Sequence, residues 1–345
     1  MRRDHRFGLL LALPLAFAAW TPRPAAAEAS LVVYCGVDEA WCRAMATTYQ
    51  KETGTDVDMT RMSSGEIYAR LRAEKENPRG DIWWGGTGDP HLQAAEEALT
   101  EPYNSPTLPK LRDWAQNQAK RSGMRTVGIY LGALGFGYNT EELARRKLAA
   151  PACWADLIKP EFKGEVQMAD PNSSGTAYTM LATIVQLMGE EPAFAYMKKL
   201  NANINEYPKA GAAPALAAGQ GETLIGIAFQ HDVLQVLRRG RPLAVVSPCE
   251  GTGFEIGSMS LIHGARHMDE AKKYYEWALT PVAQGMGPQF NSFQLPSNTA
   301  TPVPDGAPDV NKIKLIDYDF AKYGSTAERT KLLSRWTSEV KNGPR

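Results

Sequence analysis

The sequence has little that would mark a membrane protein or a nucleic-acid-binding protein. Beyond the first 27 residues, no apolar run reaches the roughly 20 residues that a membrane-spanning helix needs. Lysine plus arginine and aspartate plus glutamate each total 38 of 345 residues, so the formal net charge is zero. No basic run breaks this balance, and nucleic acid is not an expected partner. An anionic ligand would therefore have to be held by local groups.

Motifs of the common hydrolases are also missing. The chain contains neither a GxSxG nucleophile elbow nor an HExxH metal-binding pair, and its cysteine spacing matches no zinc motif. The sequence predicts no cofactor, no metal site and no catalytic residue. A secreted phosphate-ester hydrolase is the weaker alternative to a binding protein, because a histidine and two carboxylates discussed below could act as acids and bases.

The first 27 residues have the composition of a signal peptide. Arg2, Arg3 and Arg6 precede the apolar run LLLALPLAFAAW, and the small residues PAAA follow it. The run is too short for a membrane anchor, so we expect cleavage near Ala27 and export to the periplasm. Residues 1–27 hold four arginines and one aspartate, a net +3, which would leave the mature chain at −3.

Only four cysteines are present, and an even number in an exported protein favours disulfides. Cys35 and Cys42 are close in sequence, so our preferred pairing is Cys35 with Cys42 and Cys153 with Cys249. Four buried thiols are the alternative.

The order of apolar and polar residues predicts an α/β protein. Strands and helices alternate through the first third, a glycine-rich extended segment follows at 126–143, and a second alternation follows that. Another glycine-rich extended segment covers 251–262, and a polar, proline-rich link leads to a final helix near 326–340. In the first third, the expected strands are 31–35, 55–62 and 80–86, and the expected helices are 38–54, 63–74 and 89–99.

Two α/β lobes joined by two extended crossings predict a cleft between the lobes. We assign residues 28–125 plus 256–300 to lobe 1, and residues 126–255 plus 301–345 to lobe 2. Hinge motion at 126–138 and 250–258 would close the lobes on a ligand. Because ligands of open α/β sheets bind at the carboxyl ends of strands, the loops there are the candidate site.

Three of these loops combine a hydroxyl side chain with glycine at the start of a predicted helix. Such helix starts offer free backbone N–H groups and a partial positive charge, and glycine lets a ligand approach closely. Plain helix capping is the alternative for any one loop, but three loops aimed at one cleft favour an anion site. The residues concerned are Ser63, Ser64, Thr87, Gly88, Ser173, Ser174, Gly175 and Thr176.

A second group follows the predicted strand ends. His231 and Asp232 come directly after one buried strand, and Glu250 follows another. These side chains are suitable partners for sugar hydroxyls or an ammonium group. Helix capping by Asp232 and a buried structural role for His231 are the alternatives.

Four stretches resemble extracellular solute-binding proteins of ABC importers: DPNSSGTAYT, KAGAAPALAAG, IGIAFQHD and CEGTGFEIGSMS. The resemblance covers nearly the whole mature chain. It is strongest to the group related to ferric-iron-binding proteins, which includes hexose-phosphate binders. It implies a two-lobed type II periplasmic binding fold, each lobe a mainly parallel sheet flanked by helices.

The resemblance also implies a function. Iron binders of this group carry adjacent tyrosines where this chain has His231 and Asp232, and an acidic ligand near the position of Gly86 and Thr87. The only tyrosine pair here, Tyr274–Tyr275, lies within a predicted helix. This pattern favours a phosphate ester, with ferric iron and aminoalkylphosphonate as alternatives.

For a hexose phosphate, the resemblance implies that the hydroxyl and glycine loops hold the phosphate. The sugar would be held by His231, Asp232 and Glu250. The expected partners are a small anionic ligand, an inner-membrane ABC permease and possible signalling to a sensor kinase, with the protein itself a monomer.

Overall fold

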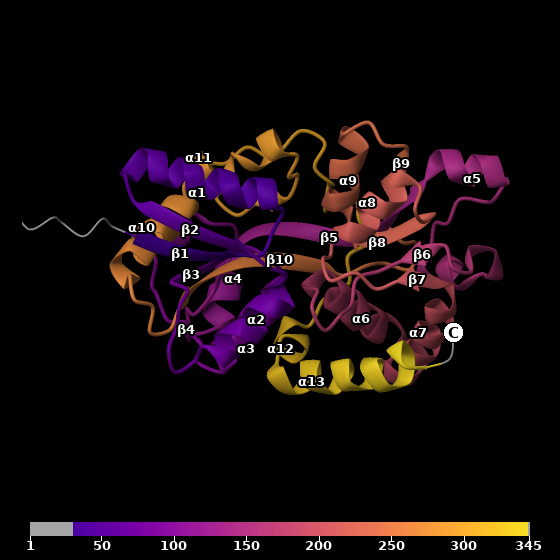
Figure 1. The fold of residues 1–345 in the computed structure, drawn as a ribbon, viewed down its shortest axis with the longest axis horizontal. Helices are drawn as coiled ribbons and strands as arrows, with labels where there is room; N and C mark the ends of the chain where they lie inside the picture. The colour runs from indigo at the N-terminus through magenta and orange to yellow at the C-terminus, as the bar shows by residue number, and fades with distance from the viewer. Residues whose placement is uncertain (1–29, 344–345) are drawn as a thin grey trace, which may run out of the picture.

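The computed structural model of the protein describes residues 30–343. The expected signal peptide, residues 1–27 with cleavage near Ala27, lies outside the described residues. The described chain forms an elongated molecule in which two α/β halves lie side by side and are joined by long strands (Figure 1). No helix within residues 30–343 combines the length and the apolar character needed to cross a membrane.

The first half is built on parallel strands with helices between them. The strand order is β2-β1-β3-β10, in which β1 pairs parallel with both β2 and β3, and β10 runs antiparallel. Asp38 caps the first helix and Gly54 ends it in the left-handed conformation, as its position in the sequence suggests. The elements are β1 (Ser30–Cys35), α1 (Glu39–Thr53), β2 (Asp56–Arg61), α2 (Ser64–Ala73), β3 (Ile82–Trp84), α3 (Gly88–Glu96), β4 (Thr100–Glu101) and α4 (Asp113–Arg121).

A single strand, β5 (Val127–Asn139), runs through both halves. Its first residues, Val127–Ala133, pair with β10 (Phe254–Ile262), and its last residues, Leu134–Asn139, pair with β8 and β9. Nearly every residue of β5 is buried. The two halves are therefore connected by a strand that is hydrogen-bonded along its whole length.

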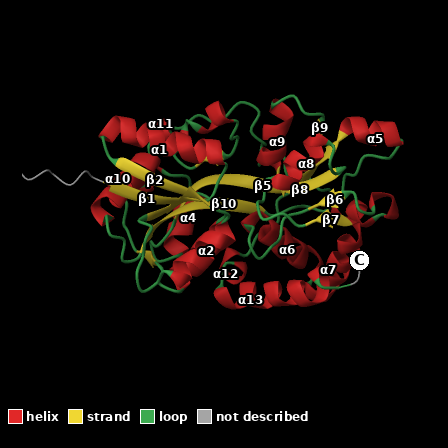
Figure 2. Cartoon of the chain, in the orientation of Figure 1, coloured by secondary structure: helices red, strands yellow, loops and turns green. Residues whose placement is uncertain are grey.

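The second half continues the sheet in the order β5-β8-β6-β7. Helices cover both sides of the strands (Figure 2). The elements are α5 (Thr140–Arg146), β6 (Val166–Gln167), α6 (Gly175–Met188), α7 (Glu190–Asn203), β7 (Ile204–Glu206), α8 (Ala213–Gln220), β8 (Ile225–Phe229), α9 (Gln230–Arg238) and β9 (Leu243–Val246).

The remaining chain returns to the first half and then crosses back. The last helix, α13, lies along the lower edge of the molecule beside α6 and α7 (Figure 1). The elements are α10 (Met268–Ala278), α11 (Pro281–Gln284), β11 (Leu295–Pro296), α12 (Phe320–Tyr323), α13 (Thr326–Arg335) and a π turn (Trp336–Lys341). Short 3-10 turns lie at Leu108–Lys110, Trp154–Ile158, Pro160–Phe162 and Gly287–Phe290.

Each half has its own large apolar core. In the first half Trp41 packs edge-on against Trp84, with ring centres 5.0 Å apart. In the second half Phe136 of β5 packs against Trp154. The second core also includes Leu92 of α3 and Ile256 of β10, so apolar packing joins the halves in part.

The predicted α/β class with a mainly parallel sheet is confirmed, and the structure differs in detail. The stretch 140–143 begins helix α5 instead of continuing the extended segment, since Asn139 caps a helix there through Glu142 N–H. Helix α4 was not predicted, because its polar sequence DWAQNQAKR buries only three residues. The lobe boundaries at 125, 255 and 300 remain predictions.

Both predicted disulfides are present. Cys35 is bonded to Cys42 and Cys153 to Cys249, and none of the four cysteines is free. The first bond ties the end of β1 to helix α1. The second ties the start of a 3-10 turn to the loop after β9, with a sequence separation of 96.

The two disulfides should contribute unequally to stability. A cross-link stabilises mainly by restricting the unfolded chain, and the restriction grows with the closed loop. The separations of 7 and 96 residues correspond to about 2.5 and about 4.7 kcal/mol. We expect Cys153→Ala/Cys249→Ala to lose more unfolding free energy in urea than Cys35→Ala/Cys42→Ala. Equal losses would contradict this, and non-reducing peptide mapping of the parent checks the pairing.

Candidate ligand-binding site

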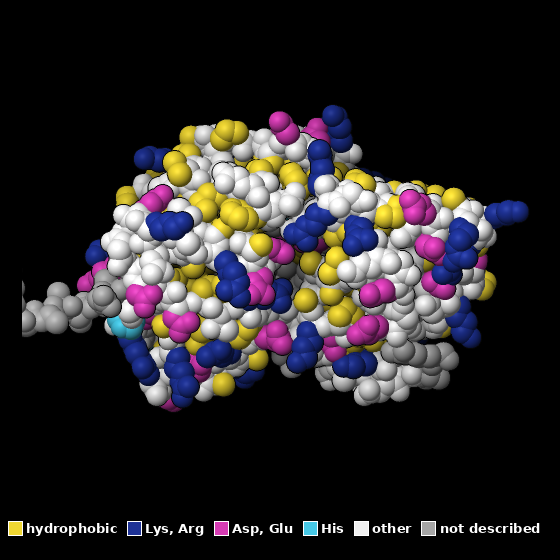
Figure 3. Space-filling view, turned by 45° about the horizontal axis from the view of Figure 1, so that its top comes forward, with side chains coloured by type: hydrophobic (Ala, Val, Ile, Leu, Met, Phe, Trp, Pro, Cys, Tyr) yellow, Lys and Arg dark blue, Asp and Glu magenta, His cyan; other side chains and the backbone are white. Residues whose placement is uncertain are grey.

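A cavity of about 280 Å³ lies between the two halves. The space-filling view shows the molecular surface hollowed along this boundary (Figure 3). Its walls come from segments far apart in the sequence, including the ends of β1 and β2, the starts of α2, α3, α6 and α9, and residues 291–294. The predicted cleft therefore exists, and strand ends and helix starts form its lining.

Three helix starts meet in one part of this cavity. Ser63 precedes α2, Thr87 precedes α3 and Ser174 precedes α6 as the capping residue of each helix. Ser174 Oγ accepts a hydrogen bond from the Ala177 N–H at 3.3 Å. The first N–H groups of an α-helix have no partner within the helix, so this wall offers hydrogen-bond donors and three positive dipole ends.

The hydroxyl side chains of this wall differ in their hydrogen-bond partners. Ser64 Oγ accepts from the Thr87 N–H at 3.1 Å, and Ser63 Oγ donates to the Lys209 carbonyl at 3.2 Å. The Thr87 hydroxyl is buried and has no hydrogen-bond partner among the described residues. Because an unpaired buried hydroxyl is costly, Thr87 is suited to a polar ligand atom. We call the wall formed by Ser63, Ser64, Thr87, Ser174, Gly175 and Thr176 the donor wall.

A buried acidic cluster forms another part of the cavity lining. His231 Nε2 lies 3.6 Å from a carboxylate oxygen of Asp232 and 3.6 Å from one of Glu255. The His231 ring stacks on Phe229, and its Nδ1 is buried without a partner among the described residues. We call His231, Asp232 and Glu255 the acidic cluster.

Burial controls the protonation of this cluster. It lowers the pKa of His231 to about 3, so the ring is neutral at pH 7. Burial also raises the pKa of Asp232 to about 7, with the Asp38 carboxylate adding to the rise and Arg61 opposing it. The pKa of Glu255 is raised well above its ordinary value by burial and then by Asp232. Both shifts favour the protonated carboxyl groups, and Asp232 is partly protonated at neutral pH.

Arg61 is the only lysine or arginine within residues 30–343 that lines the cavity. Its Nε donates to the Val37 carbonyl at 3.0 Å, which fixes the guanidinium beside the end of β1. Asp38, Glu39, Asp232 and Glu255 line the same cavity. Formal positive charge is thus scarce in the site, and the donor wall supplies most of its attraction for an anion.

Eight of the eleven predicted site residues line the cavity, and three do not. Gly88 faces the other way: a Cβ on it would lie 2.4 Å from the Ile256 carbonyl oxygen of β10. Ser173 holds its loop, with Oγ donating to the Asp170 and Lys209 carbonyls. The eight are Ser63, Ser64, Thr87, Ser174, Gly175, Thr176, His231 and Asp232.

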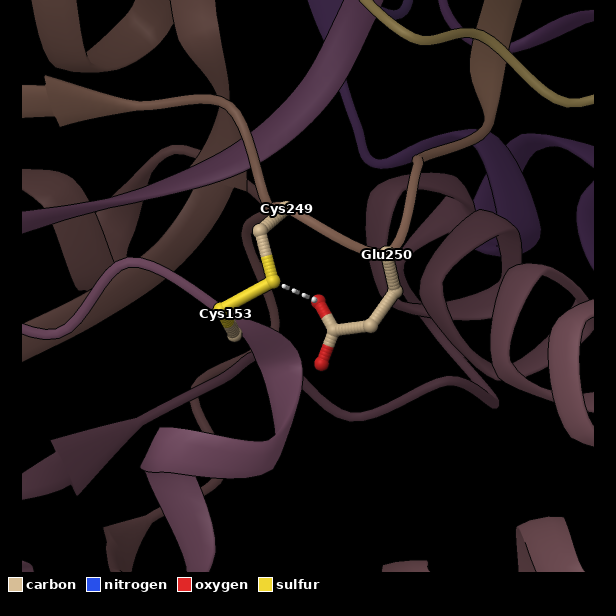
Figure 4. Close-up of side chains that lie close together, drawn as sticks. All are labelled: Cys153, Cys249 and Glu250. Atoms are coloured by element: carbon tan, nitrogen blue, oxygen red, sulfur yellow. Dashed lines mark hydrogen bonds between the residues drawn. A yellow bond between two sulfur atoms is a disulfide. The ribbon is translucent and has the colours of Figure 1, made fainter.

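Glu250 is not among the residues that line the cavity. Its carboxylate accepts hydrogen bonds from the N–H groups of Trp154 and Ala155, both at 2.8 Å. One carboxylate oxygen also lies 3.5 Å from Cys249 Sγ, beside the disulfide (Figure 4). The strand after β9 begins only at Phe254, so the carboxylate that reaches the cavity is Glu255.

Several lining residues were missed from the sequence. Glu255 is the only charged residue of the otherwise apolar and small strand FEIGSMSLI, and that isolation was an available signal. Arg61 ends β2, where strand-end reasoning also applied. Ser292 and Gln294 also line the cavity. They follow a turn far along the chain, and no local sequence pattern marks them.

The tyrosine pair Tyr274–Tyr275 lies away from the cavity. Both side chains are buried in the core of the first half, 1% and 3% exposed, where Tyr274 packs against Tyr49. His231, Asp232, Gly86 and Thr87, which the resemblance placed at the ligand positions of iron binders, all line the cavity. The described cavity lining contains one phenol, Tyr130, whose hydroxyl accepts from the Gly86 N–H at 2.8 Å.

The raised pKa of Asp232 predicts a pH-dependent effect of its replacement. The folded protein holds this proton more tightly than the unfolded chain, so ionisation costs folded stability increasingly as pH rises from 3.8 through about 7. Asp232→Asn should raise the unfolding free energy by roughly 2–4 kcal/mol at pH 8 and by little at pH 4. Urea denaturation across this range measures it.

The control for this experiment is Asp58→Asn, which makes the same chemical change at an exposed position of β2. Its effect should be small and nearly constant with pH. A stabilisation by Asp232→Asn that is the same at pH 4 and pH 8 would show that ionisation is not responsible.

Comparison with known proteins agrees with this geometry. Residues 87–323 match the family described as bacterial extracellular solute-binding protein. The periplasmic binding protein AfuA from Actinobacillus pleuropneumoniae, solved with fructose-6-phosphate bound, is 42% identical, with a TM-score of 0.89 over 92% of this chain and 100% of that one. This match and the two α/β halves identify the fold as a two-lobed type II periplasmic binding fold.

Two further relatives are more distant. A putative 2-aminoethylphosphonate-binding periplasmic protein from Salmonella typhimurium is 29% identical over 296 residues, covering 81% of each chain. Iron-bound HitA from Pseudomonas aeruginosa shares the fold with a TM-score of 0.73 at 17% identity, covering 89% of this chain and 98% of that one. The predicted likeness to the ferric-binding group with its hexose-phosphate branch is confirmed at the level of fold and family.

These relatives are binding proteins, and solute-binding proteins of this kind deliver small ligands to a permease in the inner membrane. The cavity between two halves is the architecture that such delivery requires. The chain therefore belongs to the bacterial extracellular solute-binding protein family, as the periplasmic binding component of an ABC importer.

Proposed function

We propose that the protein captures a phosphorylated sugar, a hexose phosphate, and presents it to its permease. The observation that carries this proposal is the division of one cavity into a donor wall and an acidic cluster. The donor wall suits an anion, and the acidic cluster suits a neutral, hydroxyl-rich group. A hexose phosphate combines an anionic phosphate and a neutral, hydroxyl-rich sugar in one small molecule.

The phosphate would lie against the starts of α2, α3 and α6. Backbone N–H groups at helix starts and hydroxyl donors hold phosphate without needing lysine or arginine. Thr87 and Thr176 come from different halves of the cavity lining and would contact the same phosphate group. An anion held this way would draw the halves together.

The sugar hydroxyls would lie against the acidic cluster. A carboxylate or a neutral imidazole accepts hydrogen bonds from hydroxyls, and a protonated carboxyl can also donate one. Glu255 would make the contact with the sugar that the sequence predicted for Glu250. The match to a protein solved with fructose-6-phosphate at 42% identity supports the same ligand class for this chain.

An aminoalkylphosphonate is the second candidate, and the carboxylates are the observation in its favour. An ammonium group near Asp232, Glu255 and Asp38 would be attracted to them. It would also require them to be ionised, which the burial of Asp232 and Glu255 opposes. A sugar imposes no such requirement, so we place the hexose phosphate first.

The proposal describes binding without turnover. Delivery to a permease requires a ligand that leaves unchanged, and the relatives compared above are binding proteins. We further propose export through a signal peptide cleaved near Ala27 and action as a monomer. Signalling by the loaded protein to a sensor kinase would use the same closed form as transport.

The division of the cavity predicts that two substitutions act differently. Thr176→Val should weaken every phosphorylated ligand by about ten- to a hundredfold, since a hydrogen bond to a charged group contributes roughly 1.5–3 kcal/mol. Asp232→Ala should weaken glucose 6-phosphate strongly and inorganic phosphate little. Calorimetric titration with both ligands measures these effects, and an assay for released phosphate tests for turnover.

A matched control for Thr176→Val is Thr179→Val, the same change one turn further along α6 at a buried residue that does not line the cavity. It should leave affinity unchanged. Equal losses for both ligands in Asp232→Ala would contradict the division. If the parent binds no phosphate ester at all, the proposed ligand class is wrong.

Proton release should separate the two ligand candidates. An ammonium group would expel protons from the acidic cluster, whereas sugar hydroxyls would leave the cluster protonated. We expect the binding enthalpy of glucose 6-phosphate at pH 7 to be nearly the same in buffers with different ionisation enthalpies. Release of about one proton or more on binding 2-aminoethylphosphonate, with tighter affinity than the sugar phosphate, would favour the phosphonate.

A further inference from the structure

The two halves touch beside the cavity through backbone atoms. The Gly65 N–H in α2 donates to the Ser173 carbonyl at 3.0 Å, and Ser173 belongs to the loop that leads into α6. Ser63 Oγ donates to the Lys209 carbonyl at 3.2 Å in the same region. These bonds join helix α2 of the first half to the loops that flank α6 and α8 of the second.

The contact at Gly65 leaves no room for a side chain. A Cβ on Gly65 would lie 2.7 Å from the Asn172 carbonyl oxygen and 2.7 Å from that of Ser173, closer than such atoms approach in folded proteins. Both obstacles are backbone atoms, which cannot rotate away. The backbone conformation of Gly65 itself is ordinary for a helix, so space rather than conformation is what requires glycine here.

A second glycine makes a close contact in the opposite direction, against a side chain instead of the backbone. Gly175 is the first residue of α6, and a Cβ on it would lie 1.7 Å from the Thr87 hydroxyl oxygen. Gly65 on the first half thus meets the second half, and Gly175 on the second half meets the first. Both glycines lie at helix starts of the donor wall.

We infer that closure of the halves over a ligand is set by the close contacts at these two glycines, and that Gly65 and Gly175 are closure-determining residues. Periplasmic binding proteins close by hinge rotation about their connecting strands, and the structure shows the halves in contact. Alanine at either position would hold them apart by a few tenths of an ångström or more. The donor wall would then be split while each half keeps its own ligand contacts.

Gly65→Ala should have opposite effects on the stability of the fold and on the closure of the halves, which makes the inference testable. Inside a helix, alanine is more favourable than glycine, so Gly65→Ala should leave the melting temperature of the ligand-free protein unchanged or raise it. The same substitution should disfavour closure. A variant that is more stable yet closes less separates this contact from a general loss of folding.

Cysteines at Glu66 and Lys209 would report closure without any ligand. The side chains of Glu66 and Lys209 approach to 3.9 Å across the two halves, and the Lys209 side chain is 82% exposed. The native cysteines are all in disulfides. In a Glu66→Cys/Lys209→Cys background, a short bis-maleimide should link the halves at a rate proportional to the closed fraction, even when that fraction is small.

We expect Gly65→Ala to slow cross-linking by roughly ten- to a hundredfold, the factor that overpacking a close contact corresponds to. Gly175→Ala should act in the same direction and serves if Gly65→Ala fails to fold. The matched control is Ala69→Gly, the reverse exchange at an exposed position of the same helix. It should lower the melting temperature without slowing cross-linking.

An unchanged rate in both glycine variants would overturn the inference, and so would an equal slowing by Ala69→Gly. Adding glucose 6-phosphate to the parent tests the proposed ligand separately. If the sugar phosphate does not accelerate cross-linking, the ligand assignment fails while the effect of the glycine variants still stands.

Discussion

The position of the binding site depends on strand β5. Its 13 residues pair with β10 along the first half and with β8 and β9 along the second, so a single buried strand belongs to both halves of the sheet. Because breaking these buried hydrogen bonds is unfavourable, the halves stay attached along β5 and can separate only on the sides away from it. The cavity lies where the strand ends and helix starts of the two halves face each other.

The cavity lining combines a wall that would attract an anion with a cluster of low net charge, and it does so with few formally charged groups. Helix starts and hydroxyls attract an anion, with Arg61 as the only basic side chain in the described cavity lining. Close by, burial keeps His231 neutral and favours the protonated forms of Asp232 and Glu255, so the cluster carries less negative charge than its composition suggests. The groups that bind the hydroxyls of a sugar phosphate would therefore not repel its phosphate group.

The sequence could predict those features that depend on neighbouring residues. Helix starts with serine or threonine and glycine are local patterns, and the donor wall follows from them with the exceptions of Gly88 and Ser173. The assignment of Glu250 failed because it depends on where the chain resumes a strand after β9. The turn at 247–253 places the Glu250 carboxylate over Trp154 and Ala155, and only five residues later does Glu255 reach the cavity. Contacts between the halves, such as Gly65 with Ser173, have no local signal, since they join residues that are far apart in the sequence.

The proposed ligand is one phosphorylated sugar, bound in the cavity between the halves. Native mass spectrometry of protein released gently from the periplasm of cells supplied with hexose phosphate tests it most directly. We expect a complex heavier than the bare chain by the mass of one hexose phosphate, and the released small molecule should contain phosphorus and lose phosphate on fragmentation. A complex whose extra mass is one ferric ion, or a released molecule without phosphorus, would contradict it.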